Sequence, residues 1–221
     1  MTDKNKPATY VRYAIGEIVL VVIGILIALQ INNWNEERKI NLREKSYLRN
    51  LQIDLTDDTA MLKDVVSDQL QYLERTKLLI ALVSDYIPEN IKIYDSIYNF
   101  QMKGNPTFFP NSGTYRSLIL GGNLDMISSE NLKGSLTNLY ERYYERLEYN
   151  GKIFDQKILQ FNQPRKIFIH NGFTEEALKD LSLLNGLLDE MEWRHAYIQR
   201  CKSTETELSK VLDLVAVNLN E

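Results

Sequence analysis

Ile18 to Leu29 read IVLVVIGILIAL, a run of twelve apolar residues. Extended to Ala14 and Ile31, the stretch offers about 18 positions, which at about 1.5 Å per residue span roughly 27 Å, close to the ~30 Å hydrocarbon core of a bilayer. Tyr13 before it and Trp34 after it are residue types that favour membrane interfaces. The alternatives are a buried core helix or the apolar part of a signal peptide, but no small-residue cleavage motif follows. We therefore predict an uncleaved transmembrane helix over residues 14–31.

Length and composition limit what the rest of the chain can be. The 221 residues have room for one ordinary domain beside an anchor, so we divide them into a tail (1–13), the transmembrane helix (14–31) and a soluble domain (32–221). With 26 basic and 30 acidic residues the net charge is -4, which gives no field that attracts nucleic acid, and no nucleic-acid partner is expected. The single cysteine, Cys201, cannot form an internal disulfide and leaves the redox compartment open.

The soluble domain shows helical periodicity. After Trp34 no Pro or Gly occurs before Pro88, so the anchor is predicted to continue into a long helix. Its apolar stripe has three polar interruptions, Asp58, Gln69 and Thr76. The stripe itself consists of Leu48, Leu51, Leu55, Leu62, Val65, Tyr72, Leu79 and Val83.

Further helices follow from caps and breakers. They are predicted over Glu89–Lys103, Thr114–Leu120 and Glu130–Asn162, from Thr174 to about Asn185–Gly186, and from Leu187 to the end. The last helix has a repeat of Leu187, Met191, Ile198, Cys201, Leu208, Leu212, Val215 and Leu219, with Arg194 and Glu205 as polar exceptions. The fold class predicted is all-α, an N-terminal transmembrane helix that continues into an antiparallel helical bundle.

Motifs for catalysis or metal binding are scarce. Glu192 and His195 form one E-x-x-H pair, but a di-iron site in a bundle needs a second pair, and the residue three before His170 is isoleucine. Cys201 occupies a core position of the last helix. We therefore predict no catalytic residue, no metal and no cofactor. The tyrosines 140, 143, 144 and 149 either line a ligand groove or pack in the core with their hydroxyls at the surface, and we favour the core.

Glu17 is the unusual residue of the anchor. An acid inside a membrane segment is costly and marks a candidate functional site. On a helix it shares a stripe with Gly24 and Ala28, a small-xxx-small pair that allows close helix packing. Glu17, Gly24 and Ala28 are therefore the predicted residues for transmembrane packing or relay. In the alternative, Glu17 lies about one turn inside the bilayer and reaches the headgroups.

Two stretches resemble a known family. They are YAIGEIVLVVIGILIALQINNWNE (13–36) and a second region with TYRSL (114–118), GNLDMI (122–127), Asn131-Leu132 and Tyr143-Tyr144. Both resemble a bacterial single-pass inner-membrane family of unknown function, and the pair Gly121-Gly122 is the one departure from its pattern. The resemblance implies a membrane-anchored helical domain and brings no activity, cofactor or catalytic residue.

Orientation and function follow as expectations. The cations after the anchor, Arg38 to Arg49, outnumber Lys4, Lys6 and Arg12 before it, which taken literally places the domain in the cytoplasm; we favour the periplasm because long domains translocate largely regardless of charge. The expected function is a membrane-anchored helical interaction or sensing module without catalytic activity. Its expected partners are the lipid bilayer and a second copy or another membrane protein. The alternative is a small subunit of an ion-handling membrane assembly that uses Glu17. A membrane-tethered enzyme, the third option, lacks a catalytic motif.

Overall fold

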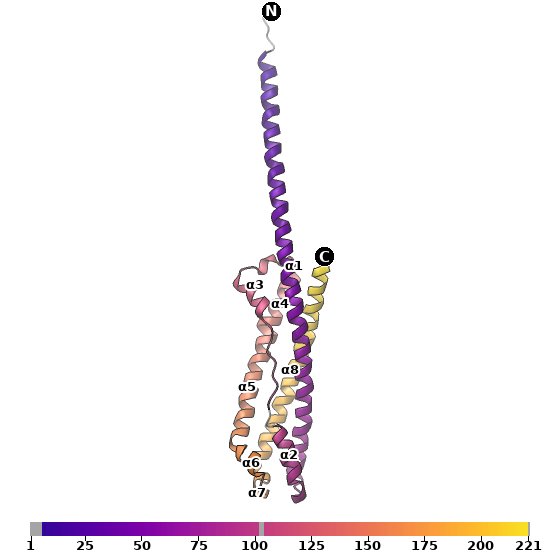
Figure 1. The fold of residues 1–221 in the computed structure, drawn as a ribbon, viewed down its shortest axis with the longest axis vertical. Helices are drawn as coiled ribbons and strands as arrows, with labels where there is room; N and C mark the ends of the chain where they lie inside the picture. Colours follow the sequence, from indigo (N-terminus) through magenta and orange to yellow (C-terminus); the bar gives the residue numbers. More distant parts are fainter. Residues whose placement is uncertain (1–5, 102–103, 221) are drawn as a thin grey trace, which may run out of the picture. The chain divides into compact units, whose positions relative to one another are not determined.

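The computed structural model describes residues 6–101 and 104–220, and every element in these two ranges is helical (Figure 1). The prediction of an all-α fold is confirmed. The chain forms two compact units, Met1–Tyr47 and Leu48–Glu221. The first helix, α1 (Lys6–Ser84), contributes to both units.

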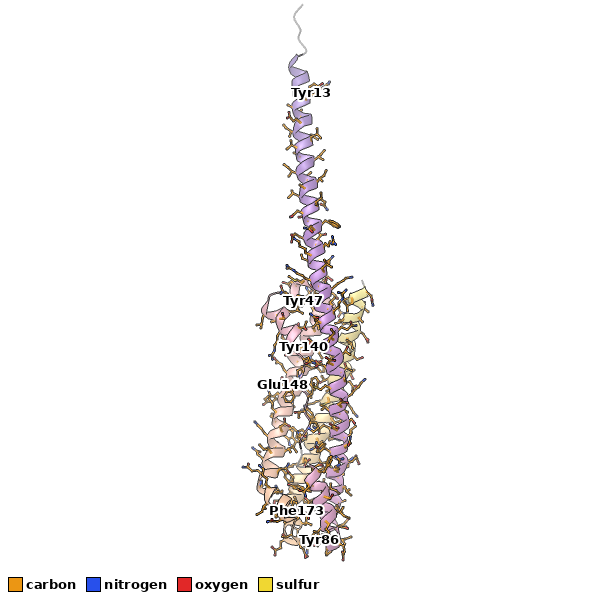
Figure 2. The ribbon with its side chains drawn as sticks, viewed as in Figure 1. Tyr13, Tyr47, Tyr86, Tyr140, Glu148 and Phe173 are labelled. Carbon is orange, nitrogen blue, oxygen red and sulfur yellow. The ribbon has the colours of Figure 1, made fainter. Side chains whose placement is uncertain are left out.

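The first unit consists of the N-terminal part of α1. Its described side chains from Arg12 to Arg43 are all exposed, and Figure 2 shows them projecting on every side of the helix around and beyond Tyr13. Among the described residues one helix, α1, is long and apolar enough to cross a membrane, and none of its apolar window is buried. Lys4 of the predicted tail lies outside the described residues, and α1 begins at Lys6.

The second unit is a helical bundle with three long members. They are α1 from Leu48 onward, the continuous helix formed by α4 (Glu130–Asn138), η3 (Leu139–Tyr144) and α5 (Glu145–Asn162), and α8 (Leu181–Asn220). In Figure 1 α8 runs antiparallel to the other two. The apolar stripe of α1 is buried as predicted except at Tyr72, which is half-buried while Leu73 is buried. The three polar interruptions, Asp58, Gln69 and Thr76, are fully buried.

Shorter elements close the ends of the bundle. They are η1 (Pro88–Asn90), α2 (Ile91–Gln101), α3 (Gly113–Leu120), η2 (Leu124–Met126), η4 (Gln163–Arg165), α6 (Lys166–Asn171) and α7 (Glu175–Leu178). An extended segment, residues 104–112, runs along the bundle to α3 (Figure 1). The predicted cap at Ser129 is present, since its side chain accepts a hydrogen bond from the Leu132 amide, as Thr174 does from Ala177. Lys103, the predicted end of the second helix, lies outside the described residues.

The boundary before the last helix was predicted wrongly. The short helix that begins after Thr174 ends at Leu178, and α8 begins at Leu181, so Asn185 and Gly186 lie inside it. A Cβ atom at Gly186 would lie 2.2 Å from the Phe161 ring. The glycine therefore allows α5 and α8 to pack closely, and it does not end a helix.

Candidate functional site

The helix that runs from Glu130 to Asn162 changes its hydrogen bonding in the middle. Residues Leu139–Tyr144, with the sequence LYERYY, form the π-helical turn η3. Such turns are rare and are frequently found at functional sites. Two grooves lie on different sides of η3, and both are lined in part by its residues.

The first groove carries carboxylates, and we call it the acidic groove. Its volume is about 570 Å³. One wall is an aromatic pair in which the rings of Tyr115 and Tyr140 stack with centroids 4.2 Å apart, and the Tyr115 hydroxyl donates to Glu141 at 2.8 Å. Burial raises the pKa of Tyr115 to about 12, so this hydroxyl remains a donor at neutral pH. The lining residues are Pro110, Ser112, Tyr115, Arg116, Ile119, Leu120, Tyr140, Glu141, Tyr144, Glu145 and Glu148.

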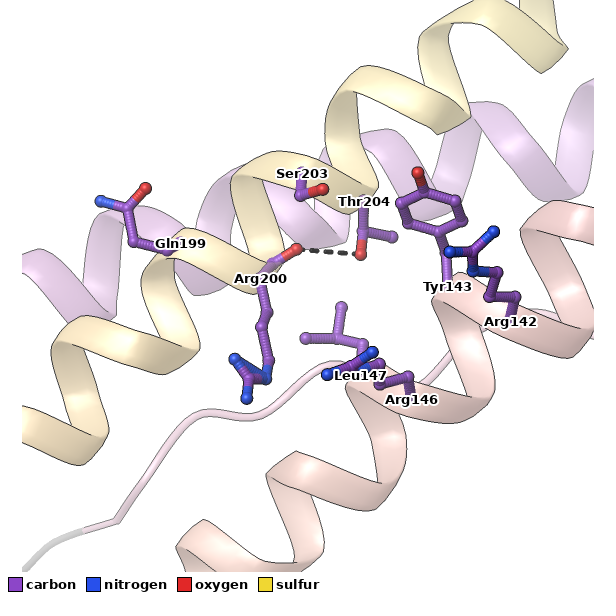
Figure 3. Close-up of a pocket in the computed structure, with 8 residues that line it drawn as sticks. All are labelled: Arg142, Tyr143, Arg146, Leu147, Gln199, Arg200, Ser203 and Thr204. Carbon is purple, nitrogen blue, oxygen red and sulfur yellow. Dashed lines mark hydrogen bonds between the residues drawn. The ribbon is translucent and has the colours of Figure 1, made fainter.

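The second groove lies between this helix and α8, and we call it the basic groove (Figure 3). Its volume is about 350 Å³. Arg142 and Arg146 enter it from η3 and α5, and Arg200 enters it from α8. The lining residues are Arg142, Tyr143, Arg146, Leu147, Gln199, Arg200, Ser203 and Thr204, and they include no carboxylate.

The three arginines of the basic groove lack counter-charges. Among the ion pairs formed by the described residues, none involves Arg142, Arg146 or Arg200. Arg142 and Arg146 are one helical turn apart, a like-charge spacing that costs about 0.2–0.5 kcal/mol. The Nε atom of Arg200 is buried without a hydrogen-bond partner, which costs about 1–3 kcal/mol for a buried donor. Arg142 and Arg146 are exposed to water and Arg200 is half-buried, so the one buried donor that these arginines leave without a partner is Nε of Arg200.

Asp58 on α1 lies beneath η3. It is fully buried, and its Oδ1 accepts a hydrogen bond from the Asn111 amide at 2.8 Å. Burial raises the pKa of Asp58 to about 6, and the charges of Asp54 and Asp57 act in the same direction. The other carboxylate oxygen, Oδ2, and the Tyr144 hydroxyl are buried without a hydrogen bond of good geometry. The Tyr144 hydroxyl nevertheless lowers the pKa of Asp58 and so offsets part of the effect of burial.

A second buried polar cluster joins α1, α8 and the extended segment. Arg194 is 1% exposed and donates to Glu190 Oε1 at 2.6 Å, to Asn105 Oδ1 at 3.2 Å and to Gln69 Oε1. Gln101 donates to the same Glu190 oxygen at 3.1 Å. Burial lowers the pKa of Arg194 and the adjacent Glu190 opposes that effect, so the guanidinium remains charged beside its partner. This cluster links α1 and α8 to the extended segment, and it lines neither the acidic nor the basic groove.

The residues predicted from the anchor belong to the first unit, whereas the lining residues of both grooves belong to the second. Glu17, Gly24 and Ala28 are exposed in the first unit, and a Cβ atom at Gly24 would meet nothing within 4 Å. Their proposed roles in packing or relay stay predictions. Neither groove contains any of them.

Other candidates from the sequence are placed as follows. Glu192 and His195 are both exposed on α8, and the His170 side chain lies outside the described residues. Among the described side chains, those of residues 12–101, 104–168 and 171–220, no group of His, Cys, Asp and Glu is arranged to hold a metal. Cys201 is buried, as predicted, and burial raises the pKa of its thiol to about 12.

The tyrosine group divides between the two expected roles. Tyr140 and Tyr144 are buried, as the core interpretation predicts, yet both also line the acidic groove. Tyr143 is half-buried in the basic groove, and Tyr149 is 65% exposed. The sequence interpretation missed the three arginines of the basic groove. The four-residue spacing of Arg142 and Arg146 was a visible signal, but the position of Arg200 opposite them depends on how two helices pair.

The described residues thus form an all-helical bundle with one apolar helix of membrane length and a π-helical turn that contributes to two grooves. Residues 17–181 match a family of unknown function (DUF6090). This match covers most of the chain, so the chain belongs to that family, and the resemblance to a family of unknown function is confirmed. No curated protein matches the chain. No solved structure matches it either.

Proposed function

We propose that this chain is a membrane-anchored, non-catalytic sensing or interaction module whose helical bundle binds a small ligand beside η3. The observation that carries the proposal is the pair of grooves of opposite charge on the two sides of a π-helical turn. Both have volumes in the range of about 300–1,000 Å³ that is typical of ligand sites. The raised pKa of Cys201 supports a non-catalytic role, because the thiolate needed for nucleophilic attack is disfavoured.

The proposed anchor is the helix over residues 14–31 in a bacterial inner membrane. Ten large aliphatic side chains lie between Ile18 and Leu29, and all are exposed. Removing each of these side chains from water is favourable by about 1.5–3 kcal/mol. Leaving all ten in water would therefore cost about 15–30 kcal/mol, which exceeds the usual stability of a domain. Lipid provides that cover. Carbonate-washed membranes are expected to retain the full chain, and its recovery in the supernatant would rule out the anchor.

We further propose that the bundle lies in the periplasm. The supporting argument is that long domains translocate largely regardless of charge. A reporter active only in the periplasm, fused after Glu221, is expected to be active. A silent periplasmic reporter beside an active cytoplasmic one would place the bundle in the cytoplasm.

Ligand binding is tested with the full chain in an uncharged detergent. A protein-free small-molecule extract of cells that express the chain is expected to raise its unfolding temperature, because a ligand that binds only the folded state stabilises it. Mass spectrometry of the extract before and after incubation should show unchanged composition. Consumption of a component would indicate an enzyme, and an unchanged unfolding temperature would contradict ligand binding.

Groove-filling variants locate the response. Ser203→Trp fills the basic groove and Ser112→Trp fills the acidic groove, whereas Ser209→Trp places the same side chain on an exposed position of α8 outside both grooves. The extract should lose its effect on one of the two groove variants and keep it on the Ser209 variant. Equal responses in all three would contradict binding in either groove.

The second candidate function is a subunit of an ion-handling assembly. Glu17 favours it, because this is the one charged residue between Arg12 and Glu36 in the sequence.

A further inference from the structure

The basic groove concentrates positive charge from two facing helices. Arg142 and Arg146 come from η3 and α5, and Arg200 comes from α8, so the groove holds three guanidinium groups (Figure 3). Each presents a planar fork of N–H donors that matches the oxygens of a carboxylate or a phosphate. The groove therefore has the chemistry of an oxyanion site.

The carboxylates nearest in sequence to these arginines line the other groove or contact other side chains. Glu141, Glu145 and Glu148 line the acidic groove, on another side of the same helix. Glu148 is paired with Lys152 at 2.7 Å. On α8, one turn beyond Ser203, Glu207 accepts a hydrogen bond from Asn138 at 3.0 Å and pairs with Lys210 at 3.2 Å. Between residues 141 and 148 the glutamates therefore line one groove, and the arginines line the other.

We propose that the basic groove binds a phosphate group carried by a small soluble molecule, a proposal that rests on the ligand-binding function above. A phosphomonoester carries a charge of about −1.5 to −2 at neutral pH and three strong acceptor oxygens, which suits three guanidiniums better than the single charge of a carboxylate. Arg200 is half-buried and its Nε is closed to solvent, so it would meet the phosphate through the terminal Nη atoms of its guanidinium. Ser203, Tyr143 and Gln199 add hydroxyl and amide groups at the edge of the groove.

The rest of the ligand has room in the same groove. The volume of about 350 Å³ lies at the lower end of the range for small-molecule sites. Leu147, 1% exposed, forms an apolar part of its wall. The Thr204 hydroxyl donates to the Arg200 carbonyl at 2.9 Å, which leaves its oxygen as an acceptor for a ligand hydroxyl. A small phosphorylated compound with at least one further hydroxyl fits these features.

The test is a titration of the full chain, in uncharged detergent and at constant ionic strength, with inorganic phosphate. Binding is measured by calorimetry and by the rise in the unfolding temperature. Wild type is expected to bind phosphate in preference to acetate. Arg146→Gln and Arg200→Gln should each weaken binding roughly tenfold or more, because each removes a charge-assisted hydrogen bond. Arg200→Lys, which keeps the charge but loses the fork, should weaken binding less than Arg200→Gln.

The matched control is Arg49→Gln, which removes an exposed arginine on α1 outside the groove and should bind phosphate as wild type does. Circular dichroism checks that each variant keeps its helix content. Equal phosphate affinity in all four variants, or no preference over acetate in wild type, would overturn the proposal. If the response to cell extract persists in that case, ligand binding stands and the phosphate assignment is wrong; if it is also absent, both are wrong.

A lipid headgroup is the other source of a phosphate group. The titration is therefore repeated in nanodiscs with and without phosphatidylglycerol. Unchanged affinity for inorganic phosphate supports a soluble ligand. Loss of the response in the discs that contain phosphatidylglycerol would show that headgroups occupy the groove and would overturn the soluble source.

Discussion

The buried ion pair between Arg194 and Glu190 allows a quantitative test of the bundle. Arg194→Met keeps much of the apolar volume of the side chain but removes the cation that Glu190, 6% exposed, contacts at 2.6 Å. Removing one partner of a buried pair costs about 3–5 kcal/mol, because the other charge stays buried and unpaired. Since each kcal/mol lowers the unfolding temperature of a chain of this size by about 2–4 °C, the expected decrease is roughly 6–20 °C.

A double variant separates the charge from the packing. Arg194→Met combined with Glu190→Leu should be more stable than Arg194→Met alone, because no charge is left uncompensated. Gln101, which donates to Glu190, keeps its bonds to Thr76 Oγ1 at 2.6 Å and to the Tyr72 carbonyl at 3.1 Å.

The assay is thermal and urea unfolding of the full chain in uncharged detergent, followed by circular dichroism. A single variant within about 1 kcal/mol of wild type would refute the reasoning, as would a double variant less stable than the single one.

Four further predictions concern other parts of the chain. The raised pKa of Asp58 means that the folded state binds a proton more tightly than the unfolded state. The contribution of Asp58 to stability should therefore fall as the pH rises from about 4 to above 6, by on the order of 3 kcal/mol in total. Asp58→Asn should flatten the pH dependence of urea unfolding, and an unchanged slope would contradict the prediction. Gly186→Ala should lower the unfolding temperature, because its Cβ meets the Phe161 ring, whereas Gly134→Ala, with open space around it, should raise it slightly; equal effects would argue against close packing at Gly186. Gly24→Leu should weaken self-association in a membrane two-hybrid assay if the small residues pack, and an unchanged signal would show that the stripe faces lipid. Glu17→Gln should leave association intact, and a loss of proton flux in liposomes with association preserved would favour the ion-handling alternative.

The helices could be predicted from the sequence because their signals are local. The stripe of α1 and the caps at Ser129 and Thr174 depend on residues a few positions apart, and the structure contains all three. Gly186 misled the prediction because a glycine that ends a helix and one that allows close helix packing look alike in a single sequence. The ring that distinguishes them, Phe161, is far away along the chain.

The candidate site could be predicted only in part. Asp58, Gln69 and Arg194 were visible as polar breaks in apolar stripes, but their partners depend on the pairing of α1 with α8 and on the extended segment. The π-helical turn changes the backbone hydrogen bonding over Leu139–Tyr144 only, which is too short a stretch to alter the spacing of apolar residues from which helices are predicted. The basic groove required Arg200 to be placed opposite Arg146, which only the packed bundle provides.

The extended segment 104–112 has a consequence for how the protein folds. It has no regular secondary structure, and its amides depend on side chains of distant helices: Phe108 N–H donates to the Tyr197 hydroxyl at 2.9 Å, and Asn111 N–H donates to Asp58 at 2.8 Å. These acceptors come from α8 and α1, so both helices must be in place before the segment can dock. We therefore expect docking of the segment to follow the pairing of α1 with α8, and hydrogen exchange at these two amides to report undocking of the segment, an opening that needs less free energy than unfolding of the bundle.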